Sequence, residues 1–167
     1  MTLRLPLPEI VCNTSPIQYL HQLGVLDAVP ALLGSIVVPQ AVADELTVGR
    51  ALGIAVPDVF SLKWIEVRSP RSAPALRLVR DLDAGEAGVL ALALETPGTV
   101  VLLDDRLARR VADSLSIPMR GTVGLLVDFK KRGFVSRVTP LLDELDRLGF
   151  RLSQRTREVI LRTAGEE

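Results

Sequence analysis

Apolar residues in this chain follow two patterns: short unbroken runs, and longer segments with an apolar residue at every third or fourth position. The short runs have the length of buried strands. They predict strands at residues 9–12, 35–39, 63–70, 99–105 and 117–121. Unbroken apolar strands that alternate with helices are typical of a parallel sheet covered on both faces, so we expect an α/β fold.

The periodic segments between these runs predict helices. Helices are expected at residues 15–24, 25–34, 39–46, 73–82, 83–95, 105–115, 122–133, about 138–148 and about 153–164. Residues 47–60 have no clear period and predict a loop with a helical turn. We expect one domain over residues 1–167, with a helical C-terminal portion from about residue 138.

Two of the predicted helix boundaries depend on specific residues. Ser15, Pro16 and Gln18 have the spacing of a capping box, which predicts Ser15 as the N-cap and Pro16 as the first helical residue. Gly49 predicts the end of the helix that begins at Pro39, because glycine is common just past the last helical residue.

The composition narrows the class of protein. Hydrophobic residues make up 48% of the chain and charged residues 24%, which indicates a folded globule. Aromatic residues are only 4%, so the core must be aliphatic, and a sheet with base-stacking aromatics is not expected. The formal net charge of zero gives no strong overall attraction to nucleic acid.

The cysteine content and the hydropathy of the chain predict the cellular compartment of the protein. The single cysteine, Cys12, ends an apolar run and is expected to be free and buried, which fits a reducing cytoplasm. The N-terminal residues lack the apolar core of a signal peptide, and no apolar run approaches the roughly 18 residues of a membrane helix. We therefore expect a cytoplasmic protein without a membrane segment.

Two of the predicted strands end in polar residues. Asn13 follows the strand at 9–12, and Asp104 and Asp105 end the strand at 99–105. Parallel strands bring their carboxyl ends to one edge of the sheet, where ligands bind near a switch in strand order. Asn13 is therefore either a turn residue or a ligand at this edge, and the sequence leaves both interpretations open.

Other acidic residues lie on predicted helices. Val42, Glu45 and Leu46 share one helical stripe, which favours an inward-facing Glu45, while Asp44 is expected to face water. The alternatives for Glu45 are the edge of the stripe or an arginine partner. Glu86 also falls on an apolar helix face.

Helix capping offers a second interpretation for some of these acids. Asp83 and Glu86 have the spacing of an N-cap and its third helical residue, which is compatible with Glu86 pointing into a cleft. Asp104 and Asp105 are adjacent carboxylates that repel each other, and a divalent cation would relieve that repulsion. Alternatively, Asp105 caps the helix that follows.

The acids at positions 45, 86, 104 and 105 offer hard oxygen ligands, which suit Mg²⁺ or Mn²⁺ rather than zinc. The one histidine, His21, lies on an ordinary helix, where a surface or core role is expected. No glycine-rich phosphate loop is present. Arg106, Arg109 and Arg110 follow the acidic strand end and either grip phosphates beside a metal ion or form a solvated helix face. The basic cluster also includes Arg120 and residues 130–132.

Taken in order, the motifs resemble those of the PIN-domain family, and specifically its VapC-like, toxin-related branch. The matching stretches are VCNTSPIQYLHQLGVLDAV, IVVPQAVADEL, DAGEAGVLALALE, VLLDDRLARRVA and RGTVGLL, and the tail from Lys130 resembles the same branch. The resemblance covers nearly the whole chain. It implies a Rossmann-like, three-layer domain with a central parallel sheet, and a ribonuclease that depends on Mg²⁺ or Mn²⁺.

The resemblance also implies roles for single residues and for partners. It implies catalytic and metal-binding roles for Glu45, Glu86, Asp104 and Asp105, with Asn13 as a further metal ligand. Substrate contacts are expected from Thr14, Arg106, Arg109 and Thr122. The implied partners are an RNA substrate, a small antitoxin protein and a second copy of the chain.

Asn13 departs from the family pattern, which has aspartate at this position, although this branch often carries Asn-Thr-Ser-Pro there. The amide keeps an oxygen but removes a negative charge. We therefore expect weaker metal binding, reliance on the other acids, or loss of nuclease activity. Two other classes stay open: a non-catalytic module that binds RNA or a protein, and a doubly wound domain that uses Mg²⁺ for phosphoryl transfer.

Overall fold

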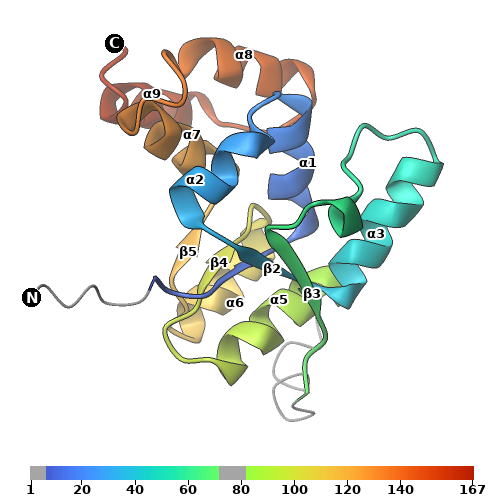
Figure 1. The fold of residues 1–167 in the computed structure, drawn as a ribbon. Coiled ribbons are helices and arrows are strands. Elements are labelled where there is room, and N and C mark those ends of the chain that lie inside the picture. Colours follow the sequence, from blue (N-terminus) through green and yellow to red (C-terminus); the bar gives the residue numbers. More distant parts are fainter. Residues whose placement is uncertain (1–6, 72–81) are drawn as a thin grey trace, which may run out of the picture.

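A central sheet of five parallel strands organises the computed structural model, which describes residues 7–71 and 82–167 (Figure 1). The strands are β1 (Ile10–Cys12), β2 (Ile36–Pro39), β3 (Ile65–Arg68), β4 (Val100–Leu102) and β5 (Met119–Arg120). Each predicted strand is confirmed, and every residue of β1 and β2 is buried, as expected for a sheet covered on both faces. The helix predicted at 73–82 lies outside the described residues, apart from Leu82.

The strand order β3-β2-β1-β4-β5 places β1 beside β4, although the two strands are far apart in the sequence. Val11 pairs with Val37 of β2 on one side and with Val101 of β4 on the other. The chain builds outward from β1 to β3 and then returns to β4, so the strand order reverses between β1 and β4. In doubly wound sheets this reversal opens the crevice in which ligands bind.

Helices cover both faces of the sheet and complete the three layers of the predicted α/β fold (Figure 1). Helices α5 and α6 lie below the sheet in this view, and α1, α2 and α7 lie above it. Helix α3 packs against α1 and α5. The helix bounds are α1 Thr14–Gln22, α2 Val29–Leu33, α3 Gln40–Ala51, α5 Ala84–Glu95, α6 Arg106–Ser114, α7 Thr122–Lys131, α8 Thr139–Arg147 and α9 Gln154–Thr163. Short 3₁₀ turns occupy Leu26–Ala28 and Val59–Ser61.

Helix α5 is apolar on all sides, and most of its residues are buried, which is typical of a helix in the centre of a domain. Gly88 allows this helix to approach the end of β2, because a Cβ atom there would lie 2.8 Å from the Cβ of Pro39. The first turn of α5 is therefore held close to the carboxyl edge of the sheet, and it carries Glu86 there.

Two predicted helix boundaries are wrong. Helix α1 begins at Thr14, so Asn13 and not Ser15 takes the N-cap position, and no side chain caps the helix. Helix α3 runs through Gly49 to Ala51, and the chain turns at Gly53, whose φ of 86° favours glycine. At the first boundary a local pattern was outweighed by a distant partner, because the Ser15 hydroxyl donates to Asp104.

The core is aliphatic, as the composition predicts, and its residues come from all five strands and from the helices that face them. Cys12 is buried and free, and burial together with the charge of Asp104 raises the pKa of its thiol. His21 is exposed on α1, in agreement with a surface role.

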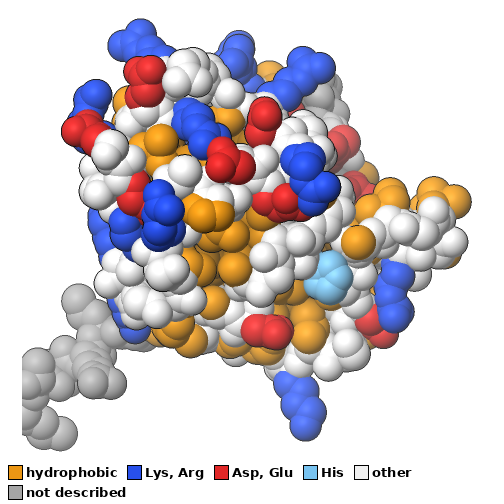
Figure 2. Space-filling view, turned by 90° about the horizontal axis from the view of Figure 1, so that it is seen from above, with side chains coloured by type: hydrophobic (Ala, Val, Ile, Leu, Met, Phe, Trp, Pro, Cys, Tyr) orange, Lys and Arg blue, Asp and Glu red, His pale blue; other side chains and the backbone are white. Residues whose placement is uncertain are grey.

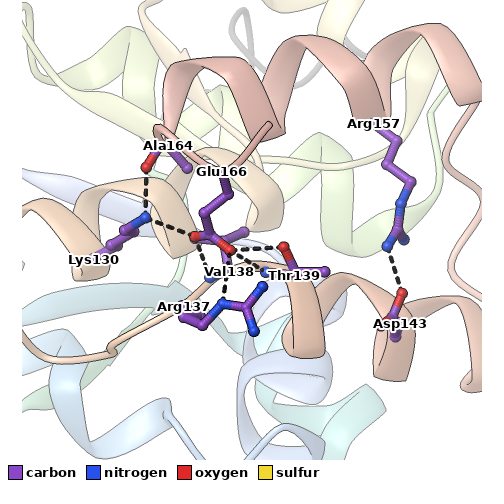
Figure 3. Close-up of polar contacts among 8 residues, drawn as sticks. All are labelled: Lys130, Arg137, Val138, Thr139, Asp143, Arg157, Ala164 and Glu166. Atoms are coloured by element: carbon purple, nitrogen blue, oxygen red, sulfur yellow. Dashed lines mark hydrogen bonds and ion pairs between the residues drawn. The ribbon is translucent and has the colours of Figure 1, made fainter.

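A buried carboxylate, Glu166, ties the C-terminal helices to the rest of the fold (Figure 3). It accepts hydrogen bonds from Lys130 Nζ at 2.8 Å, from the Thr139 hydroxyl at 2.7 Å, and from the backbone N–H groups of Val138 and Thr139 at 2.7 and 3.0 Å. We call these four residues the Glu166 cluster. They join the end of α7, the start of α8 and the segment after α9.

Burial alone would raise the pKa of Glu166, but the hydrogen bonds from Lys130, Val138 and Thr139 outweigh it and hold this pKa well below its usual range. The Lys130 ammonium also donates to the carbonyl of Ala164 at 2.6 Å. An ion pair between Arg157 and Asp143 connects α9 to α8 further along (Figure 3).

Figure 2 shows the face that carries the C-terminal helices. Acidic and basic side chains are interspersed on it, with hydrophobic side chains between them, so this face has no field of a single sign. Among the described residues, no helix is long and apolar enough to cross a membrane.

Candidate active site

A cavity of about 800 Å³ opens at the carboxyl edge of the sheet, where the strand order reverses. Seven of the nine predicted site residues line it, namely Asn13, Thr14, Glu45, Glu86, Asp104, Asp105 and Arg106. Of the other two, Thr122 is fully buried below it and Arg109 lines the adjoining cavity. We call the first cavity the acidic cleft.

Asp104 lies at the end of β4 and is held by three hydrogen bonds. Its Oδ2 accepts from the hydroxyls of Ser15 at 2.8 Å and Thr122 at 2.6 Å, and its Oδ1 accepts from the Thr122 backbone N–H at 2.8 Å. These donors come from the first turns of α1 and α7. Three bonds from two helices fix one rotamer of this carboxylate, so it is a preorganised ligand.

Asp105 has a structural role as the N-cap of α6. Its Oδ2 accepts from the backbone N–H of Ala108 at 2.9 Å, so it caps α6 as the alternative interpretation predicted. Asp105 nevertheless lines the acidic cleft, and its Oδ1 accepts no hydrogen bond from another residue of the described ranges. Asp83 likewise caps α5, by accepting from the backbone N–H of Glu86 at 2.8 Å.

Glu45 is exposed and not turned into the core, while Val42 and Leu46 of the same stripe are buried. The prediction of an inward-facing Glu45 is therefore wrong, and the alternative of the stripe edge holds. The edge faces the acidic cleft, where Glu45 Oε2 accepts a hydrogen bond of 2.5 Å from the Thr14 hydroxyl.

Gly85 brings Glu45 and Asn13 together at the start of α5. A Cβ atom at this position would lie 2.7 Å from Glu45 Oε1 and 3.2 Å from Asn13 Oδ1. Both oxygens therefore occupy the space that any other residue would fill. The Asn13 side chain is buried, and its backbone N–H donates to the Leu102 carbonyl at 3.1 Å, so it is held at the strand end beside β4.

The electrostatics of the acidic cleft are uncompensated. Burial and the nearby carboxylates of Asp83, Asp105 and Glu45 raise the pKa of Glu86 from 4.5 to about 7, although the Asp83 backbone opposes this shift. None of the ion pairs among the described residues involves an acid of this cleft. Burial is the larger cause of this shift, and the negative charge of the neighbouring carboxylates, which adds to it, would also attract a cation.

The donor set suits a hydrated divalent cation. Within residues 7–71 and 82–167, no three Asp, Glu, His or Cys side chains converge closely enough to hold one metal ion directly. Mg²⁺ usually keeps several water ligands and binds through one or two carboxylates together with substrate phosphates. The preorganised Asp104, the titrating Glu86 and the oxygens of Glu45 and Asn13 fit that mode of binding.

The predicted basic residues separate into two groups. Arg106 lines the acidic cleft, and Arg109 donates from Nη1 to the Leu103 carbonyl at 2.8 Å, beside Asp104 and Gly121. Arg120 instead pairs with Asp128 at 2.5 Å, and Lys130 belongs to the Glu166 cluster. Of these predicted basic residues, the arginines at the start of α6 therefore stay available near the acids.

Several residues of the cleft were not predicted from the sequence. Ser15, Gln18, Tyr19, Phe150 and Arg151 also line it or support its acids. Tyr19 and Phe150 contact each other edge to face, with ring centroids 5.0 Å apart. Phe150 and Arg151 lie in the loop after α8, and no local pattern links that loop to a strand end more than 40 residues earlier.

Comparison with known proteins agrees with a divalent-cation site in the acidic cleft. The sequence model of one protein family, described as a PIN domain (DUF3368), matches residues 9–166. No curated protein matches the chain. PIN domains are in general nucleases that act on RNA and use divalent metal ions. The match covers almost all of the chain, so the protein belongs to the PIN-domain family.

Proposed function

We propose that this protein is an endoribonuclease of the toxin–antitoxin type that hydrolyses RNA phosphodiester bonds with the help of Mg²⁺ or Mn²⁺. The observation that carries the proposal is the acidic cleft, in which five carboxylates gather at the switch point of a PIN-domain sheet, next to arginines. None of these carboxylates forms an ion pair with a described residue. A carboxylate cluster beside cationic side chains suits a polyanionic substrate approached through a metal ion.

Asp104, Glu86, Glu45 and Asn13 would hold the metal ion, with Asp105 at the rim. When bound, the ion supplies an activated water and offsets negative charge on the phosphate. The chain's own residues do the rest. Ser15 and Thr122 fix the Asp104 carboxylate, Thr14 orients Glu45, and Arg106 and Arg109 orient the phosphate.

Glu86 has a further role as the proton-carrying group of the cleft. Its pKa of about 7 means that it exchanges a proton near neutral pH, which is the range in which a general acid or base works best. The same property makes ion binding compete with protonation. Cleavage should therefore rise with pH up to about 7, as Glu86 loses its proton.

The proposal extends to compartment and partners. The free, buried Cys12 fits a reducing cytoplasm. Large hydrophobic side chains are exposed on α3 and the following segment, namely Val48, Leu52, Ile54 and Phe60. Exposed apolar surface of this kind is typical of interfaces, so we assign it to a second copy of the chain or to a small antitoxin.

A cleavage assay tests the function. The purified protein should cleave single-stranded RNA in Mg²⁺ or Mn²⁺ and not in EDTA. Asp104→Asn should lower the rate at least about 100-fold, because even indirect partners of metal ligands are worth 10–100-fold. Cleavage that survives both Asp104→Asn and Glu86→Gln would come from a contaminating nuclease and would contradict the proposal.

Asn13 favours one competing function, a PIN domain that binds RNA or a protein partner without cutting. Calorimetric titration of Mn²⁺ into wild type and Asn13→Asp separates the two. If Asn13 is a ligand, the added charge should tighten Mn²⁺ binding and raise cleavage. Equal affinities would remove Asn13 from the metal site, and RNA binding without cleavage in both proteins would favour the non-catalytic function.

A further inference from the structure

A second cavity, of about 500 Å³, adjoins the acidic cleft and has the opposite character. Four arginines line it: Arg106, Arg109 and Arg110 from α6, and Arg151 from the loop before α9. We call it the arginine pocket. Its remaining walls come from the first turn of α7 and from residues 150–156.

Within residues 7–71 and 82–167, the four arginines of the arginine pocket share their cavity with a single carboxylate, Asp104. None of the nine ion pairs among the described residues involves Arg106, Arg109, Arg110 or Arg151. Elsewhere most arginines are paired, as Arg68 is with Glu9 and Glu66, and Arg157 with Asp143. In a chain of zero net charge, this local excess marks a site for an anion that the protein does not itself provide.

The pocket and the cleft form one continuous surface. Asp104, Arg106, Phe150 and Arg151 line both cavities. Asp104 keeps its negative charge, but the four guanidinium groups of the arginine pocket outnumber this one carboxylate. An anion in the pocket therefore lies beside the acids and arginines that surround the reacting phosphate.

Close packing forms the floor of the pocket. A Cβ atom on Gly121 would lie 2.8 Å from Arg109 Nη1 and 3.2 Å from Asp104 Oδ1, so only glycine lets this guanidinium lie against the end of β4. Arg109 is also fixed by its hydrogen bond to Leu103. Arg110 and Arg151 are exposed, so their guanidinium groups are free to meet a ligand.

We propose that the arginine pocket binds a second phosphate of the RNA strand, adjacent to the phosphate that is cleaved in the acidic cleft. This inference rests on the proposed function. The planar guanidinium fork matches the oxygens of a phosphate, and several forks around one cavity suit a group with more than one free oxygen. Phe150, which lines both cavities and packs on Tyr19, offers an apolar surface for the base between the two phosphates.

Continuity with the cleft favours RNA over an acidic protein segment as the occupant. A nucleic-acid strand places its next phosphate at a fixed, short distance along the backbone, whereas carboxylates of a peptide have no such repeat. An aromatic side chain between two phosphate sites can stack on a nucleobase, whereas a glutamate side chain offers no ring to stack on it. The pocket thus requires a strand with at least two phosphates.

Binding measurements in EDTA test the pocket apart from catalysis. Fluorescence anisotropy of a labelled single-stranded oligouridylate would be recorded over a range of sodium chloride concentrations for wild type and for Arg110→Gln/Arg151→Gln. The double variant should bind about 10-fold more weakly, as expected for lost charge-assisted hydrogen bonds. The slope of log affinity against log salt should fall by about 0.7 for one lost phosphate contact. Arg132→Gln, on an exposed arginine outside both cavities, is the matched control and should change neither quantity.

Short competitors locate the second phosphate. A trinucleoside diphosphate should displace the label better than a dinucleoside monophosphate from wild type, and this advantage should vanish in the double variant. An unchanged salt slope, an unchanged advantage, or absence of RNA binding by wild type would each overturn the inference. Stronger competition by oligoglutamate than by oligouridylate would also overturn it, in favour of an acidic protein segment. Failure of the wild type to cleave in Mn²⁺ counts against the proposed function alone, because the anisotropy results stand without cleavage.

Discussion

Glu166 and Glu86 are carboxylates of the same chain, and their surroundings shift their pKa values in opposite directions. Glu166 is buried among four hydrogen-bond donors, one of them the Lys130 ammonium, and its pKa lies well below the usual range. Glu86 is partly buried beside Asp83, Asp105 and Glu45, and its pKa rises to about 7.

The difference shows how burial serves structure in one region and chemistry in the other. The donors around Glu166 hydrogen-bond its carboxylate, and these bonds connect the C-terminal helices to one another. The acids around Glu86 repel one another, so the fold must hold them together at a cost in stability. Such a cost is typical of functional sites, where charge is arranged for a ligand and not for the folded chain.

Removing the Glu166 carboxylate, which has all its hydrogen-bond donors around it, should have the largest effect on stability. Glu166→Ala leaves the Lys130 ammonium and two backbone N–H groups without their acceptor, so we expect a loss of about 3 kcal/mol of unfolding free energy. This corresponds to a fall in Tm of about 6–12 °C. Glu167→Ala, which removes an exposed ion pair with Arg162, is the control and should change Tm little.

The pH dependence of that loss has a definite sign. Because the pKa of Glu166 is depressed in the folded state, its contribution is present above about pH 4.5 and disappears as the pH falls further. The gap in Tm between wild type and Glu166→Ala should therefore narrow in acid. A gap that stays constant down to pH 3 or so would contradict the assigned role.

The hydroxyls that support Asp104 should matter next. Ser15→Ala and Thr122→Val each remove one hydrogen bond from its Oδ2, and each should lower kcat/KM for RNA about 10–100-fold through poorer metal binding. Ser114→Ala, whose hydroxyl only contacts the Val111 carbonyl, is the control. Loss of activity should be rescued in part by higher Mn²⁺ concentrations, which a general folding defect would not allow.

A methyl group at position 85 probes the tightest point of the cleft. Gly85→Ala would place a Cβ atom within 2.7 Å of Glu45 Oε1, so this carboxylate must move and Mn²⁺ affinity should fall about 10-fold. The folded state should not suffer, because alanine is a better helix former than glycine. Gly49→Ala has room for its methyl group, 3.6 Å from Ile54, and serves as the control that leaves Mn²⁺ affinity unchanged.

Neutralising Glu86 should have the smallest effect, and it should stabilise the folded state, whereas Glu166→Ala destabilises it. Its raised pKa makes the folded state lose stability as the pH rises from 4.5 to about 7. Glu86→Gln should remove this decline and stabilise the protein by about 1 kcal/mol above pH 7, after allowance for solvent screening, with no gain below pH 4.5. Asp113→Asn, an exposed acid on α6, should show no such trend. Thermal melts over this pH range give the comparison.

The fold could be predicted from the sequence because its strands are unbroken apolar runs. The apolar runs at residues 9–12 and 99–103 indicate strands of a buried parallel sheet, and the polar residues that follow them mark its carboxyl edge. The positions of Asn13 and Asp104 in one cleft followed from that rule, whereas Glu86 was expected there from its apolar helix face and from the family resemblance.

What could not be predicted depends on contacts between distant residues. Ser15 has the local pattern of a helix cap, but Asp104, 89 positions later, takes its hydroxyl. Helical periodicity places Glu45 beside Val42 and Leu46 without showing that a cleft opens at the edge of the stripe. Arg151 reaches the arginine pocket only because α8 and α9 fold back over α7.

The order of the elements along the chain sets the sequence in which the parts of the site are made. Ribosomal synthesis delivers all five strands, the acids of the cleft and Thr122 before it delivers Phe150 and Arg151. Glu166, which fixes the C-terminal helices, emerges later still. A nascent chain can thus assemble its carboxylates while the arginine pocket still lacks a wall, so this pocket is the part of the candidate site that is completed last during translation.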